Sequence, residues 1–277
     1  MARNYGVPDE WVLPISISEA QRMTQLETMS WEKDGKVARV VFSRPQLLNA
    51  MSNQATIDIN TIADALAKED DVRLVVITGT GRSFSTGIDL KQLSTDQIEM
   101  VYHQRWERAL RTFELMEKIV IVGIKQYCLG GGLQLALACD VRVAADNAIL
   151  GLPAIKESLI PGLGTFRLAH YVGLGRAKRL ILSGENVNAQ DAYAMGLVDY
   201  VAPLADFETR LEQIVQQYLK VCSIATVKSK TLTNLSFELG YDAFLQKYFE
   251  LQEIAQTSDD HLEARRAYRE NRDPIFK

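Results

Sequence analysis

Hydrophobic and polar positions follow two different periods along this chain. Near the start, MSWEKDGKVARVVF places short apolar runs on both sides of Asp34–Gly35, and such a pair between two runs predicts a β-hairpin. Over residues 53–68 isoleucine and leucine recur near the helical spacing, which predicts a helix. The β-branched run VRLVVITG behind it predicts a buried strand, so a strand–helix–strand rhythm is established.

The same rhythm continues through the middle of the chain. We expect a helix at about 96–116, the strand KIVIVGIK, a helix behind three glycines, and the short strand DVRVAA. Beyond Gly162 helical patterns dominate, and after Leu204 almost no strand-like sequence remains. The pattern therefore predicts an α/β core over 27–203, preceded by a polar extension (1–26) and followed by a C-terminal helical region (204–277) for oligomerisation or as a lid.

Composition narrows the classes of partner. The 277 residues are 47% hydrophobic, enough for a large core, and 31 Lys and Arg against 35 Asp and Glu leave no basic excess for nucleic acid or an anionic membrane. Three cysteines without CxxC spacing and an N-terminus without a signal pattern favour the cytoplasm. The three histidines form no HxH or HExxH signature, so we expect no metal site.

The segment CLGGGLQLALACD, residues 128–140, carries the first candidate chemistry. Glycines that open a helix expose backbone N–H groups at its positive end, where an oxygen of a phosphate or a polarised carbonyl can approach. GGGLQL has neither the P-loop ending nor dinucleotide-loop spacing, and alone it is as readily a tight turn. A second glycine loop, FSTGIDL at 84–90, also follows a predicted strand, so the N–H groups of both loops could converge beyond the sheet.

Ordered motifs from about Met29 to the C-terminus resemble the enoyl-CoA hydratase/isomerase (crotonase) family. They are RPQLLNAMS, VVITGTGRSFSTGIDLKQL, LGGGLQLALACDVRVAADNAILGLPAI, IPGLGTFRL, VGLGRAKRLILSG and AQDAYAMGLVDYV. The resemblance implies a crotonase-like ββα spiral fold with C-terminal trimerisation helices, in a homotrimer or dimer of trimers. It also implies an acyl-CoA thioester whose carbonyl binds in an oxyanion hole formed by the backbone N–H groups of Ile88 and Gly131, with no cofactor beyond the coenzyme A of the substrate.

The resemblance fails at the residues that move protons. Hydratases of this family carry two glutamates, and this sequence has Gln134 and Ala154 at those positions. Gln134 either holds a water or substrate oxygen or is a plain polar residue of the helix start. Glu157, three residues after Ala154, is a candidate replacement, with a solvent-facing charge as the alternative. Some relatives carry an acid eight residues after the second glutamate, but here that position is Gly162.

Two further sets of residues are candidates. His103, four residues before Glu107, could form an oriented pair with it on one helix face, although a solvated helix face is the simpler interpretation. The family resemblance places coenzyme A near five residues of the first loop regions. These five are Gln46, Leu48, Asp89, Leu90 and Lys91. Because relatives often have a basic residue where Gln46 stands, a phosphate contact is either absent or comes from Arg269, Arg272 or Lys277 in the tail, which are as readily a solvated helix end.

Three functions are consistent with these observations. The first is an enoyl-CoA hydratase/isomerase-like lyase with non-standard acid/base residues, acting in fatty acid metabolism. The second is an acyl-CoA decarboxylase or a C–C bond hydrolase of β-diketone type, because such reactions need the oxyanion hole more than paired glutamates. The third is a non-catalytic acyl-CoA-binding scaffold, since both glutamates are replaced.

Overall fold

A seven-stranded sheet forms the centre of the computed structural model, which describes residues 23–95 and 97–276. The strand order is β1-β2-β3-β4-β5-β7-β10; pairing is antiparallel from β1 to β3 and parallel from β3 onward. The strands are β1 (Met23–Gln25), β2 (Met29–Asp34), β3 (Val37–Phe42), β4 (Leu74–Gly79), β5 (Ile119–Ile124), β7 (Val141–Ala145) and β10 (Tyr200–Ala202). The predicted hairpin is confirmed, because β2 and β3 pair around Gly35, whose φ of +57° suits glycine.

A smaller sheet lies beyond the carboxyl end of β5. It contains β6 (Tyr127–Leu129), β8 (Ile149–Gly151) and β9 (Asn186–Asn188), with β6 and β8 parallel. Three helices come from the same part of the chain: α5 (Gly164–Val172), α6 (Leu174–Ser183) and α7 (Ala189–Ala194). This arrangement turns the chain away from the large sheet directly before the three glycines.

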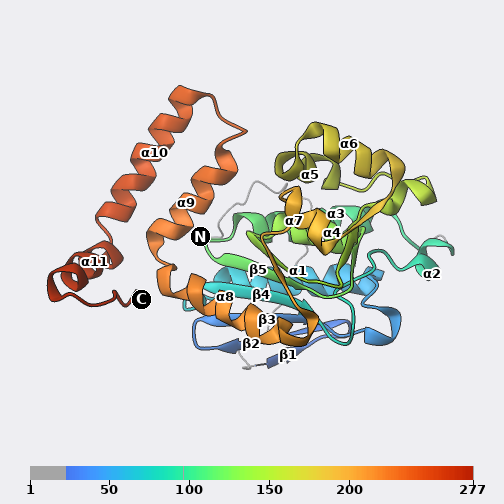
Figure 1. The fold of residues 1–277 in the computed structure, drawn as a ribbon, viewed down its shortest axis with the longest axis horizontal. Coiled ribbons are helices and arrows are strands. Elements are labelled where there is room, and N and C mark those ends of the chain that lie inside the picture. Colours follow the sequence, from blue (N-terminus) through green and yellow to red (C-terminus); the bar gives the residue numbers. More distant parts are fainter. Residues whose placement is uncertain (1–22, 96, 277) are drawn as a thin grey trace.

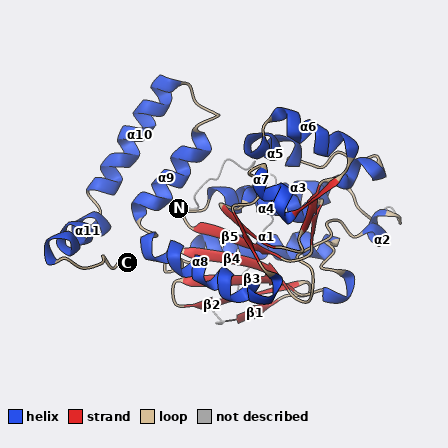
Figure 2. Ribbon diagram, in the orientation of Figure 1, coloured by secondary structure: helices blue, strands red, loops and turns tan. Residues whose placement is uncertain are grey.

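Helices cover both faces of the large sheet (Figure 2). Alternate residues of β4 point to opposite sides: Val75 and Ile77 pack with α1 (Asn53–Lys68) and α3 (Met100–Leu115), while Leu74 and Val76 pack beneath α8 (Phe207–Val221). In Figure 1 α8 lies across the sheet, on the side opposite α1. The predicted helix at 96–116 corresponds to α3, and Asp96 lies outside the described residues.

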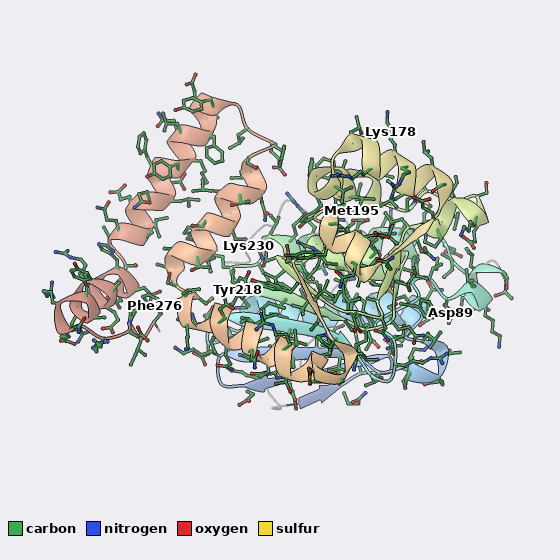
Figure 3. The ribbon with its side chains drawn as sticks, viewed as in Figure 1. Asp89, Lys178, Met195, Tyr218, Lys230 and Phe276 are labelled. Atoms are coloured by element: carbon green, nitrogen blue, oxygen red, sulfur yellow. The ribbon has the colours of Figure 1, made fainter. Side chains whose placement is uncertain are left out.

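The C-terminal helices are α9 (Ile224–Leu235), α10 (Tyr241–Gln256) and α11 (Asp259–Glu270), and α10 and α11 extend away from the sheet (Figure 1). Lys230 of α9 fastens this region to the core: its Nζ lies 2.8 Å from Asp140 Oδ2 and donates to the Lys118 carbonyl at 2.9 Å (Figure 3). Large apolar side chains on the projecting part are exposed, among them Phe237, Tyr241 and Tyr268.

Two elements cross the boundaries that were expected for the core. The 1–26 extension was expected to lie outside the sheet, but β1 begins at Met23 and pairs with β2; residues 1–22 lie outside the described part of the chain. The region from 204 was expected to be an appendage, yet its first long helix, α8, buries Phe207 and Leu211 against the sheet. In the described part of the chain, no helix combines the length and apolarity that a membrane crossing requires.

Candidate active site

Two glycine-containing loops meet at the edge of the smaller sheet. Ser85 and Cys128 form a parallel bridge in which the Ser85 N–H donates to the Tyr127 carbonyl (2.8 Å) and the Leu129 N–H to the Ser85 carbonyl (3.0 Å). The backbones approach so closely that a Cβ at Gly87 would lie 2.6 Å from the Leu129 oxygen. The convergence expected of the 84–90 and 128–132 loops is therefore present.

The same contacts leave two N–H groups unpaired. The Met51 N–H donates to the Gly87 carbonyl (2.8 Å), and the Met51 carbonyl accepts from the Asp89 N–H (3.0 Å). Ile88 lies between Gly87 and Asp89, and neighbouring N–H groups of an extended segment alternate in direction, so the Ile88 N–H points away from Met51. Gly131 is the first residue of α4 (Gly131–Ala138), where an N–H has no partner within the helix. Across residues 23–95 and 97–276, neither N–H finds an acceptor.

Buried side chains line the space beside Gly131. Relative to a Cβ at this glycine, Met51 Sδ would lie at 3.0 Å and the Trp106 ring at 3.6 Å. The Tyr102 hydroxyl donates to the Met51 carbonyl at 3.2 Å, and burial, reinforced by the charge of Asp89, raises the tyrosine pKa. These contacts pack apolar and aromatic side chains beside Gly131.

Gln134 lies one turn along α4 from Gly131 and approaches a carboxylate. Gly162, with φ +50°, has no side chain, and a Cβ there would lie 2.8 Å from Gln134 Oε1 and 2.9 Å from Glu107 Oε1. The amide from α4 and the carboxylate from α3 therefore converge on one point of the 160–164 loop. Gln134 is half-buried, and its chemical role stays a prediction.

Glu107 is held by two donors. Its Oε1 accepts from the Leu163 N–H (2.9 Å) at the start of α5, and its Oε2 accepts from Arg167 Nη1 (2.8 Å). Arg167 is buried and also contacts Glu114 through Nε (3.3 Å), while Arg111 donates to Glu114 at 2.9 Å. Burial acts to raise the pKa of Glu114, but the neighbouring Arg167 and Arg111 hold it below its ordinary value.

His103 precedes Glu107 by one turn of α3. Burial lowers the pKa of His103 below its ordinary value, and the negative charge of Glu107 acts in the opposite direction. The two side chains therefore lie near enough to influence each other, as their spacing suggested. A catalytic role of His103 stays a prediction.

Glu157 lies apart from this cluster. It ends the 3₁₀ helix η3 (Pro153–Glu157), its side chain is exposed, and no hydrogen bond or ion pair joins it to the described residues. Ala154, at the beginning of η3, is half-buried. The assignment of Glu157 as the replacement acid stays a prediction, and nothing in its surroundings orients it.

The five residues expected to contact coenzyme A divide into two groups. Gln46, Leu90 and Lys91 are exposed, whereas Leu48 and Asp89 belong to the framework of the loops. The Leu48 carbonyl accepts from the Thr86 N–H (3.2 Å). Asp89 accepts from Arg44 (3.2 Å) and caps α2 (Leu90–Leu93) through the Lys91 N–H (Figure 3). Coenzyme binding by these residues stays a prediction.

Sequence reasoning missed the link between α3 and the start of α5. The spacing of His103 and Glu107 was visible, but the role of Gly162 in giving space to Gln134 and Glu107 was not. One signal was available: IPGLGTFRL is one residue shorter than the text usual in the family, so the start of the following helix was open to change. Here the Glu107 carboxylate holds that helix start through the Leu163 N–H.

Known proteins resemble this chain over most of its length. The sequence profile of enoyl-CoA hydratase/isomerase matches residues 32–277. A probable mitochondrial enoyl-CoA hydratase of Dictyostelium discoideum is 30% identical over 268 residues, covering 95% of this chain and 96% of that protein. A short-chain-enoyl-CoA hydratase of Clostridium acetobutylicum is 30% identical over 256 residues, covering 90% and 97%.

A solved structure shows the same fold. The crystal structure of an enoyl-CoA hydratase from Bacillus anthracis matches with a TM-score of 0.86 at 30% identity, covering 91% of this chain and 99% of that one. The expected crotonase-like fold is thereby confirmed. Because profile, relatives and fold agree over nearly the whole described chain, the protein belongs to the enoyl-CoA hydratase/isomerase (crotonase) family.

Proposed function

We propose that the protein transforms enoyl-CoA thioesters by hydration or isomerisation through an enolate of the thioester. The observation that carries the proposal is the pair of unpaired N–H groups, Ile88 and Gly131, on two loops joined by the Ser85–Cys128 bridge. The family profile and the hydratases among the relatives support the same reaction class.

The two N–H groups suit an oxygen that gains negative charge. In both reactions the electrons of the reacting carbon centre move to the thioester oxygen, and donors that are already in position stabilise that charge without reorganisation. One such donor is typically worth about 10²–10³ in rate. The positive end of α4 adds to the effect, because Gly131 is its first residue.

Substrate and assembly follow from the same proposal. The ligand is an acyl-CoA thioester whose coenzyme lies along the exposed Gln46, Leu90 and Lys91, with no other cofactor. We further propose a homotrimer or dimer of trimers, supported by the exposed aromatic side chains of the projecting C-terminal helices. Light scattering on the purified protein tests this assembly. We place the protein in the cytoplasm, where its three buried free thiols stay reduced.

Replacing Gly131 with proline tests the oxyanion hole. Proline at the first position of a helix removes the N–H and fits the helical backbone there. Its Cβ would lie 3.0 Å from Met51 Sδ, so circular dichroism and the melting temperature first establish that the variant is folded. The matched control is Leu174→Pro at the exposed first position of α6. We expect wild type and the control to consume the conjugated ultraviolet absorbance of crotonyl-CoA or a longer enoyl-CoA, and Gly131→Pro to be slower by about 10²–10³.

Two outcomes would contradict the proposal. A folded Gly131→Pro variant with the wild-type rate would show that this N–H does not stabilise the reacting oxygen. A wild-type protein that binds these thioesters without consuming them, and that forms no conjugated product from 3-hexenoyl-CoA, would refute the enoyl-CoA reaction. Malonyl-type thioesters and β-diketones would then separate a decarboxylase or hydrolase from a scaffold.

A further inference from the structure

The proposed reaction needs a group that takes up a proton and returns it. Gln134, one turn from Gly131, carries an amide, which does not exchange a proton in this way at neutral pH, and Ala154 carries no polar group. A carboxylate, an imidazole or a similar side chain must therefore reach the substrate from another element. This inference rests on the proposed function.

Glu107 brings a carboxylate to Gln134. Their oxygens lie 2.9 Å and 2.8 Å from one point, the position of a Cβ at Gly162, so they are no farther apart than the sum of these two distances. The neighbouring residue on α3, Trp106, packs its ring next to Gly131. α3 therefore contributes side chains both beside Gly131, through Trp106, and beside Gln134, through Glu107.

The carboxylate is oriented and still has free lone pairs. Each oxygen accepts one hydrogen bond, from the Leu163 N–H or from Arg167 Nη1, while a carboxylate has about four acceptor positions. Its side chain retains 16% exposure, whereas Arg167 retains 4%. The two donors fix the Glu107 carboxylate, and part of the side chain remains accessible.

We propose that Glu107 is the catalytic residue that carries the proton. In hydration, Glu107 removes a proton from water as the water oxygen bonds to C3, and the electrons of the C2–C3 double bond move to the thioester oxygen. Glu107 then returns that proton to C2 as the carbonyl re-forms, so one water is added and the carboxylate is regenerated. In isomerisation, Glu107 takes a proton from C2 of a 3-enoyl thioester and delivers it to C4.

A purely structural role is the competing explanation. Glu107 caps the start of α5 and neutralises Arg167, and Glu114 neutralises the same arginine from the other side. Glu114→Gln is therefore the matched control, because it removes one negative charge from Arg167 without touching the carboxylate beside Gln134. If Glu107 acted only by neutralising Arg167, the two glutamine variants would behave alike. Glu107 also caps α5 through the Leu163 N–H, so the loss of that cap is read separately, as a melting temperature below that of Glu114→Gln.

Hydrogen exchange separates the two roles. Butyryl-CoA has no double bond, so in D₂O it reports only removal and return of the C2 proton, read by mass spectrometry. We expect wild type and Glu114→Gln to incorporate deuterium at C2 and to turn over crotonyl-CoA or 3-hexenoyl-CoA. Glu107→Gln should lose both activities by about 10² or more, with butyryl-CoA affinity and melting temperature close to those of Glu114→Gln.

Each of the other possible results would change the assignment of Glu107. Exchange and turnover by Glu107→Gln at the Glu114→Gln level would overturn the assignment to Glu107. Loss in Glu157→Gln with activity retained in Glu107→Gln would transfer the role to Glu157. Equal losses in both Arg167-paired variants would show a structural effect. Wild type without turnover or exchange would refute the proposed function, and the assignment with it.

Discussion

Replacing Gly87 with alanine perturbs the contact that aligns the two oxyanion loops. Gly87 has φ +84°, a region that costs an L-residue about 1–2 kcal/mol. The new Cβ would also lie 2.6 Å from the Leu129 oxygen and 3.0 Å from the Gly131 nitrogen, although ordinary contact begins at 3.4 Å. One of the two loops must therefore move by most of an ångström. This movement displaces the Gly131 N–H relative to the loop that contains Gly87.

Gly173 provides the control for backbone strain. Its φ of +78° is close to that of Gly87, and with ψ 156° it lies in a region nearly restricted to glycine, but a Cβ there would have nothing within 4 Å. Gly173→Ala should therefore show only the conformational cost, about 1–3 kcal/mol, or a loss in melting temperature of roughly 2–12 °C for a chain of this size. The free energy of unfolding of Gly87→Ala should fall by about 1–3 kcal/mol more, because the atoms nearest to its new Cβ are backbone atoms that must shift.

The activities should separate more clearly than the stabilities. A misplacement near 1 Å can cost about 10² in rate, so we expect Gly87→Ala to lose about two orders of magnitude in turnover of crotonyl-CoA. Gly173→Ala should keep the wild-type rate below its melting temperature. Wild-type turnover by Gly87→Ala, or an equal loss in both variants, would refute the argument that the close approach of the loops sets the oxyanion hole.

Two further predictions concern the framework of the site. Lys230→Met removes the ammonium group that lies 2.8 Å from Asp140, and it should lower the free energy of unfolding in urea by about 3–5 kcal/mol. The control Lys247→Met breaks an exposed ion pair and should lower it by less than about 1 kcal/mol; similar losses in the two variants would contradict this reasoning. Burial lowers the pKa of His103 in the folded protein below the ordinary value of 6.5. At a pH below 6.5 the unfolded chain therefore binds more protons at this residue than the folded protein does. The contribution of His103 to the free energy of unfolding is thus complete above pH 6.5 and is lost as the pH falls below it. Melting curves of wild type and His103→Gln across that range should converge on acidification, and parallel curves would exclude the effect.

The sequence by itself determined the alternation of the core and the position of the two glycine loops. The β-branched run of β4 has no other stable location than a buried strand, and Asp34–Gly35 allows a tight hairpin, because both are local preferences of the backbone and its side chains. The glycines at the start of α4 indicated N–H groups open to an oxygen, and the resemblance to the crotonase family implied that Ile88 and Gly131 form the oxyanion hole.

Only the tertiary structure brought a carboxylate to Gln134. Glu107 and Gly162 are 55 positions apart in the sequence, and nothing local to α3 shows that its glutamate reaches the start of α5. Glu157 was closer in sequence to the missing glutamates, yet η3 leaves its side chain exposed. Which acid meets the substrate depends on how three helices pack around one glycine, and packing between distant segments is not encoded in any short stretch of sequence.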